Sequence, residues 1–282
     1  SRLCYFGVTE PEKVPALMAL SACVSFYLYG GHFLKAQKFA DSLKEFIEDH
    51  GGKVLVKSKA DKILTENREV KGVKAGDKIF RSPVVVSNAN AKTTFLELTG
   101  TNNLDKKYAE YVKGLKMSPS CFMVFLGVDI NLSNYPTLIK NLDEGYEFVI
   151  NSIADPSLAP EGKTSLTISG GANYYDFPAR ETEEYLHKKN ELAEMLIQKA
   201  EKVIPGLSKR IVVLDAATPK TFERYTLIPE GALYVFDQSI DTKRPYFKTP
   251  IKGLYLAGAS TFPGGGIESV IMSGTICAND IC

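Results

Sequence analysis

Hydrophobic and polar positions follow two different patterns in the first 235 residues, and helices and short strands predominate early. Residues 33–50 carry apolar side chains at helical spacing and are followed by Gly51 and Gly52, which predicts an amphipathic helix with a glycine stop. Residues 53–57 alternate as a strand, and 61–65, 70–75 and 78–80 predict further short strands. The β-branched run in 83–88 predicts a fully buried strand of a parallel sheet.

The middle of the chain has the pattern of an antiparallel sheet. Residues 121–128 and 147–153 are apolar strands, and 165–170 alternates like a strand with one exposed face. A long helix is expected over 181–204, because its first turn is acidic and Pro205–Gly206 ends it. A strand at 211–214 and a polar, aromatic loop over 217–234 follow.

The C-terminal pattern is a strand, a glycine-rich turn and a helix. Residues 254–257 predict a buried strand, and 267–278 a buried helix with Ile267, Val270, Ile271 and Gly274 on one face. The apolar stretch 14–31 is shorter than the ~20 residues of a bilayer span. It therefore favours a buried helix over a membrane-surface element.

Composition and charge narrow the class of protein. The 282 residues include 34 Lys and Arg against 33 Asp and Glu, a balance that argues against a nucleic-acid partner. The five cysteines form no CxxC pair, and the three histidines lie far apart in the sequence, so no metal site is predicted. A reducing cytoplasm is the expected location, with peripheral membrane contact left open. The sequence assigns no catalytic residue.

The glycines remain as candidate chemistry. Glycines between a strand and a helix let backbone amides approach a ligand, with the positive end of the helix aimed at it. Pro263 and Gly264–Gly266 stand at such a junction. Tight packing of the helix on the strand is the structural alternative.

Four stretches together resemble a family. GLYLAGASTFPGGGIESVIMSG (253–274) resembles the C-terminal flavin-contacting motif of the phytoene desaturase, carotenoid isomerase and retinol saturase group of FAD-dependent oxidoreductases, within the flavin amine oxidase superfamily. Residues 30–64, 84–100 and 217–234 are similar to further segments of that group, in the same order. The resemblance implies a mixed α/β fold, in which part of a Rossmann-like FAD-binding domain accompanies an antiparallel-sheet substrate domain.

The resemblance also implies cofactor contacts. The backbone at Gly258 and Ala259 is expected along the pyrophosphate–ribityl part of FAD, and that of Gly264, Gly265, Gly266 and Ile267 at the pyrimidine edge of the flavin. Ala60, at the end of the strand after the second glycine pair, would meet the adenine. Gly30 and Gly31 would approach the flavin from the substrate side.

The expected substrate is a long, apolar isoprenoid. Phe222, Tyr225, Phe262 and part of 14–29 are expected to line its tunnel, with ordinary core packing as the alternative for 14–29. Glu268 departs from the small or proline residues of many relatives. It either complements the helix dipole or contacts a polar substrate.

One departure concerns the length of the resemblance. No GxGxxG fingerprint of a Rossmann unit occurs in the sequence, so the chain resembles the C-terminal portion of a longer enzyme. Residues 30–115 and 236–282 would belong to the FAD-binding domain, and 1–29 and 116–235 to the substrate domain.

We expect hydride transfer that desaturates, saturates or isomerises a carotenoid-like molecule. A flavin amine oxidase acting on a polar amine and a non-catalytic module for apolar ligands or protein interactions are the alternatives. The isolated chain is expected to bind FAD weakly or not at all, to be inactive and to form an oligomer.

Overall fold

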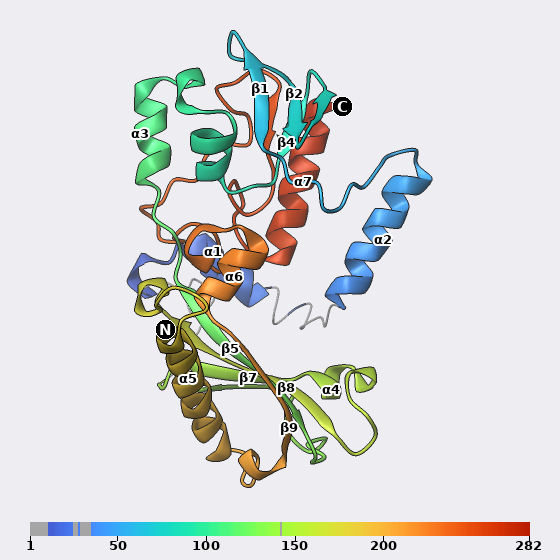
Figure 1. Ribbon diagram of the computed structural model, residues 1–282, viewed down its shortest axis with the longest axis vertical. Coiled ribbons are helices and arrows are strands. Elements are labelled where there is room, and N and C mark those ends of the chain that lie inside the picture. The colour runs from blue at the N-terminus through green and yellow to red at the C-terminus, as the bar shows by residue number, and fades with distance from the viewer. Residues whose placement is uncertain (1–10, 25–27, 29–34, 142) are drawn as a thin grey trace. The chain divides into compact units, whose positions relative to one another are not determined.

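The computed structural model describes residues 11–24, 28, 35–141 and 143–282, and its chain forms two compact units (Figure 1). The first unit consists of Lys116–Thr242 with the described part of Ser1–Lys13, and the second of Val14–Leu115, where described, with Lys243–Cys282. The functional division expected from the sequence, with boundaries at 29/30, 115/116 and 235/236, stays a prediction. Each unit is treated separately below.

The first unit is an antiparallel sheet with one long helix on its face. Its strand order is β6-β7-β8-β5-β9, and neighbouring strands pair antiparallel throughout. The main elements are β5 (Ser120–Val128), β6 (Leu138–Asn141), β7 (Tyr146–Ile150), α4 (Asn151–Ala154), β8 (Thr164–Ala172), α5 (Glu183–Glu201), β9 (Ile211–Ala217) and α6 (Pro219–Thr226). Short 3-10 turns lie at Pro11–Lys13, Pro156–Leu158, Tyr174–Asp176, Ser208–Arg210 and Pro229–Gly231.

Alternation along these strands builds the core of the first unit. In β5, Phe122, Val124, Leu126 and Val128 are all buried on the side that faces the core. The helix α5 closes that side with Ala193, Leu196, Ile197 and Ala200. Thr182 caps α5, since its hydroxyl accepts a hydrogen bond from the Tyr185 amide at 3.2 Å. The predicted antiparallel sheet and long helix are therefore confirmed.

The second unit contains two small sheets and several helices. Its helices are α1 (Ala16–Val24), α2 (Ala36–Asp49), the π-helical segment η4 (Thr93–Leu98), the 3-10 turn η5 (Thr101–Asn103), α3 (Lys106–Gly114) and α7 (Ile267–Ile281). One sheet joins β1 (Lys62–Glu66), β2 (Glu69–Ala75) and β3 (Lys78–Arg81), and the other pairs β4 (Val85–Ser87) with β10 (Leu254–Leu256) in parallel. Figure 1 shows α7 as the red helix at the end of the chain.

Hydrogen bonds link the two small sheets. The Val70 amide donates to the Lys252 carbonyl at 2.9 Å, and the Lys252 amide donates to the Arg68 carbonyl at 2.9 Å. Leu254 and Leu256 of β10 are buried, as the apolar pattern predicted. This arrangement fixes the strand that leads into the glycine-rich turn.

Several local predictions are wrong. Residues 53–57 form no strand, and Leu55 and Val56 are exposed, because no described strand pairs with this stretch. The strand at 83–88 is not fully buried, since Val84 and Val86 are exposed. Residues 151–153, expected to continue the strand that begins at 147, belong to the helix α4 (Asn151–Ala154).

Two helices expected to be buried leave apolar side chains exposed. In α1, Leu17 and Leu20 are exposed; part of the 14–31 prediction lies outside the described residues. In α7, Ile267 and Ile271 are exposed, and the small residues Ser273 and Cys277 are the buried ones. Helical spacing identified the apolar stripe correctly, but it could not show which side packs. None of the helices that the structure describes is long and apolar enough to cross a membrane.

Candidate functional site

The glycine-rich turn of the second unit joins the buried strand β10 to the N-terminus of α7. Gly258 has φ +87°, and a Cβ placed there would overlap Oδ1 of Asn88. Gly264 and Gly266 have φ values of +122° and +107°. Residues other than glycine rarely adopt such backbone angles. The sequence therefore has glycine where the turn requires it.

The start of the turn is held by hydrogen bonds to the surrounding segments. The Ala257 amide donates to the Ser87 carbonyl at 3.0 Å, and the Gly258 amide donates to Oγ of Ser273 at 3.0 Å. The Ala91 amide donates to Oγ of Ser260 at 3.0 Å. The residues that separate β10 from Pro263 therefore have a defined backbone.

At the end of the glycine-rich turn, the N-terminus of α7 is accessible to a ligand. Gly266 is the N-cap residue, and no side chain that the structure describes caps the helix there. The first helical amides, starting at Ile267, have no partner within the helix, and a helix N-terminus carries about half a positive charge. Glu268 is exposed in the first turn, where a carboxylate complements that charge.

These residues meet the requirements of a flavin ring lying against backbone. Gly266 has open space where a Cβ would stand, because its nearest neighbour is Oγ of Ser269 at 4.0 Å. Apolar side chains stand exposed at the same turn, with Phe262 62 % and Ile267 55 % exposed. Open backbone, a positive helix end and an apolar rim fit an aromatic ring that gains negative charge at one edge.

The structure brings together only part of the predicted cofactor set. Gly258, Ala259, Gly264, Gly265, Gly266 and Ile267 lie on one continuous turn in the second unit. Ala60 is half-buried and immediately precedes Asp61 and β1; it does not end a strand as expected. Gly30 and Gly31 lie outside the described residues. The flavin contacts of all these residues stay predictions.

The predicted substrate residues are divided between the two units. Phe262 and Glu268 belong to the second unit, whereas Phe222 and Tyr225 belong to the first. Phe222 is half-buried and Tyr225 is 76 % exposed. Their roles in a tunnel remain predictions.

Phe222 and Tyr225 stand on a helix that the sequence analysis described as a loop. The N-cap of α6 is Thr218, which forms a capping box with Thr221 and precedes Pro219 at the first helical position. The Thr–Pro pair followed by Thr221 is a start signal that could have identified the helix.

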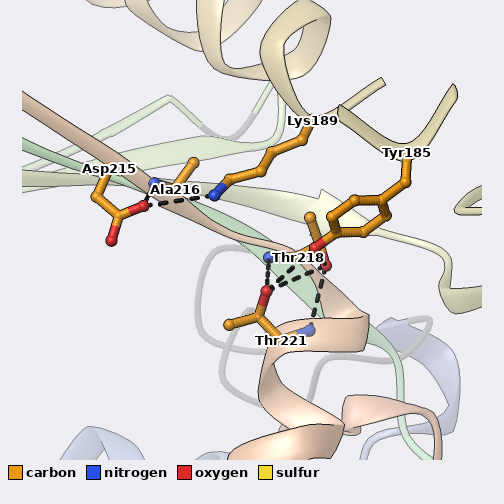
Figure 2. Close-up of polar contacts among 6 residues, drawn as sticks. All are labelled: Tyr185, Lys189, Asp215, Ala216, Thr218 and Thr221. Atoms are coloured by element: carbon orange, nitrogen blue, oxygen red, sulfur yellow. Dashed lines mark hydrogen bonds and ion pairs between the residues drawn. The ribbon is translucent and has the colours of Figure 1, made fainter. Parts of the chain in front are cut away.

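A polar network attaches α6 to α5 and β9 (Figure 2). The Tyr185 hydroxyl lies 2.9 Å from Oγ1 of Thr218 and 3.3 Å from Oγ1 of Thr221, and Lys189 contacts Asp215 at 3.4 Å. Burial acts to raise the pKa of Tyr185, but hydrogen bonds to the two threonines, with the charges of Arg180 and Lys189, leave it below its ordinary value. The network therefore fixes where α6 begins.

A second polar cluster surrounds the outer side of α6. Oη of Tyr174 donates to Glu223 at 2.6 Å, and Lys220 lies 3.4 Å from the centre of the Tyr174 ring. Burial, followed by the hydrogen bond to Glu223, raises the pKa of Tyr174 to about 12. These groups satisfy one another, so they position the helix and leave no evident catalytic group.

Known carotenoid enzymes are similar to this chain in sequence. Prolycopene isomerase of Arabidopsis thaliana, a chloroplastic protein, is 30% identical over 259 residues, which cover 86% of this chain and 44% of the isomerase. The neurosporene-forming phytoene desaturase of Cereibacter sphaeroides is 25% identical over 266 residues, covering 85% of this chain and 51% of the desaturase. The chain thus spans about half the length of these relatives.

Solved structures share the fold. An oxidoreductase from Methanosarcina mazei superposes with a TM-score of 0.74 at 22% identity, covering 98% of this chain and 63% of that structure. Cyclohexylamine oxidase from Brevibacterium oxydans gives a TM-score of 0.61 at 13% identity, covering 99% and 63%. The mixed α/β fold expected from the sequence is therefore confirmed.

The family model for flavin containing amine oxidoreductases matches residues 18–282, nearly the whole chain. This match and the relatives confirm the resemblance stated from the four sequence stretches. The chain belongs to the family of flavin containing amine oxidoreductases.

Proposed function

We propose that this chain supplies the flavin-ring site of an FAD-dependent oxidoreductase that acts on a long, apolar, carotenoid-like isoprenoid. The observation that carries the proposal is the glycine-rich turn, in which open backbone meets the uncapped N-terminus of α7. FAD, when bound, supplies the hydride acceptor or donor of the reaction. The chain's own residues bind and orient the ring.

The turn is suited to tune as well as to hold the cofactor. Backbone amides of Gly264, Gly265, Gly266 and Ile267 are proposed to face the pyrimidine edge of the ring. A helix N-terminus stabilises negative charge by about 0.3–1 kcal/mol at an exposed position. We therefore propose that α7 favours the reduced cofactor.

An apolar substrate agrees with the exposed side chains around the turn. Ile267 and Ile271 lie one helical turn apart on α7 and are both exposed, as is Phe262. We propose that Phe262 lines the substrate path; the tunnel roles of Phe222 and Tyr225 stay predictions. Replacing Phe262 with Asp is expected to block turnover of an apolar substrate while flavin stays bound; unchanged turnover would remove Phe262 from the path.

Glu268 provides a test of substrate polarity. In one role, its exposed carboxylate complements the positive end of the α7 dipole. In the alternative role, it contacts a polar group of the substrate. Turnover of Glu268→Gln on apolar and polar polyenes separates the two roles. Equal, unchanged rates leave only the dipole role, whereas a loss confined to the polar polyene supports substrate contact.

The amine oxidase alternative rests on shared architecture. Cyclohexylamine oxidase shares the fold at 13% identity, whereas prolycopene isomerase is similar at 30% over most of the chain. The direct test offers the protein, with FAD added in excess, a carotenoid precursor and an aliphatic amine in parallel and follows flavin reduction. Reduction by the amine alone would reject the isoprenoid proposal.

For the 282-residue chain by itself we propose weak cofactor binding. The sequence has no GxGxxG loop, whose amides would contact the two phosphates of FAD at roughly 1.5–3 kcal/mol each. The expected loss is several powers of ten in affinity. We expect the chain to purify colourless and without activity, and to self-associate through exposed apolar faces or to contact a membrane peripherally. Stoichiometric flavin absorbance after gel filtration of a monomer would contradict this.

A further inference from the structure

Arg244 links the segment before β10 to the start of the glycine-rich turn. Its Nη1 donates to the carbonyl oxygen of Ala259 at 2.6 Å, and the side chain is half-buried. The next residue, Pro245, accepts a hydrogen bond from Oγ1 of the buried Thr261 at 2.8 Å. The stretch 244–245 therefore contacts the turn at two positions two residues apart.

The same guanidinium also faces the end of the turn. A Cβ on Gly264 would stand 3.1 Å from Nε of Arg244 and 3.5 Å from its Cζ. Gly264 also has φ +122°, so the residue must be small for two reasons, the backbone angle and the proximity of the guanidinium. One planar side chain thus lies between Ala259 and Gly264, five residues apart in the turn.

We propose that Arg244 is a positioning residue that sets the distance between the two ends of the glycine-rich turn, and with it the flavin-binding backbone. The inference rests on the proposed function for its meaning, because the turn it positions is the proposed flavin site. An arginine suits this role, since its rigid fork donates along one edge while its planar face packs against backbone. A lysine ammonium can reach the same carbonyl, but it has no guanidinium group to stand against Gly264.

The charge of Arg244 has a second consequence. It stands at the same turn as the N-terminus of α7, and both favour negative charge. A half-buried cation is screened less than an exposed one. We therefore expect the turn to favour a ligand that carries or gains negative charge, as a flavin does at its pyrimidine edge.

Amide hydrogen exchange of the ligand-free chain tests the positioning role directly. Arg244→Gln removes the charge and the planar fork, Arg244→Lys keeps the charge, and Lys243→Gln is the matched control on the exposed neighbour. The amides of Gly258 and Thr261 form hydrogen bonds within this region, so their exchange rates report on the stability of the turn. Loss of a charge-assisted bond is expected to raise exchange in 258–266 by about 10- to 100-fold in Arg244→Gln. Arg244→Lys should recover part of this protection, and Lys243→Gln should match the parent chain.

Two outcomes would overturn the proposal. One is unchanged exchange in 258–266 of the folded Arg244→Gln variant. The other is an equal rise in the β5–β8–β9 sheet of the first unit, because that would indicate general destabilisation and no specific effect on the turn.

Titration with FAD, followed by quenching of flavin fluorescence, separates this inference from the proposed function. We expect Arg244→Gln to bind FAD about 10-fold or more weakly than Lys243→Gln, with Arg244→Lys between them. If FAD binds to the parent chain without protecting 258–266, the proposed flavin site fails, while exchange of the ligand-free chain still decides whether Arg244 positions the turn. If FAD binds equally to all three variants although exchange rises, the link between the turn and the flavin fails.

Discussion

The two compact units bury their apolar residues in different ways. In the first, five strands and α5 enclose one continuous core that includes the fully buried Phe148, Ile150 and Ile168. In the second, the sheets have three and two strands, and α2 has no buried residue although Phe46 and Ile47 lie on its apolar side. The first unit is thus organised by side-chain packing. Around its turn, the second is organised by hydrogen bonds between backbone groups and side chains such as Ser273, Ser260 and Arg244, and it leaves apolar faces open.

A matched pair of phenylalanines should show this contrast most strongly. Phe148→Ala leaves a cavity in the core of the first unit and is expected to lower the free energy of unfolding by about 3–5 kcal/mol. Phe46→Ala on α2, where the ring is 62 % exposed, should change it by less than about 0.5 kcal/mol. Urea denaturation followed by circular dichroism measures both. Similar losses would show that α2 is packed in solution and that the contrast is wrong.

A matched pair of glycines tests the turn in the second unit. Gly264→Ala places a side chain at φ +122° and against Arg244, and should cost about 1–2 kcal/mol and weaken flavin binding. Gly274→Ala lies within α7 with nothing near its added Cβ, and should raise stability by about 0.5–1 kcal/mol. Thermal unfolding and FAD titration measure both. Equal effects from the two variants would reject the requirement for glycine at 264.

The cap of α6 gives a smaller effect in the first unit. Thr218→Ala removes the capping hydroxyl and the contact with Tyr185, and is expected to cost about 1 kcal/mol. Thr218→Ser keeps the hydroxyl and should retain most of that stability. If both variants are equally unstable, the methyl packing of Thr218 matters more than its hydrogen bonds.

An exposed ion pair gives the smallest expected effect. Hydrogen bonds from Lys252 and then Lys71 lower the pKa of Glu69 to about 2. Because the folded-state pKa is depressed, the pair stabilises the fold above about pH 4.5, and this contribution disappears as the pH falls towards 2. Glu69→Gln should therefore be slightly less stable than the parent chain at neutral pH and equal to it near pH 2. Melting curves across this range test it, and a difference that persists at pH 2 would exclude the ion pair as its cause.

Sequence patterns predicted the helices and strands better than they predicted which of their faces are buried and which strands have partners. The β10–turn–α7 junction, the parallel pairing of β4 and the antiparallel sheet could all be predicted, because periodicity and glycine placement are local properties. The exposure of Ile267 and Ile271 could not, since a helical stripe does not reveal what covers it. The strand expected at 53–57 failed for a related reason, as a strand requires a partner.

The same distinction separates the residues of the candidate site that local sequence identified from those that only the folded chain brings there. Glycine at 264 and 266 was singled out from the sequence because glycines between a strand and a helix let backbone approach a ligand, and Gly258 followed from the family resemblance; the structure adds that all three have a positive φ. Arg244 was not, because it precedes the motif and reaches Ala259 only through the folded chain. The N-cap at Thr218 carried a readable signal that the aromatic character of 217–234 obscured.

Binding of the flavin ring by the glycine-rich turn is tested most directly by amide hydrogen exchange with and without saturating FAD. We predict slower exchange concentrated in residues 258–270 and unchanged exchange in the sheet formed by β6, β7, β8, β5 and β9, with the effect reduced in Gly264→Ala. Fluorescence quenching of the same samples establishes that FAD is bound. Bound FAD without protection of 258–270 would contradict the proposed site.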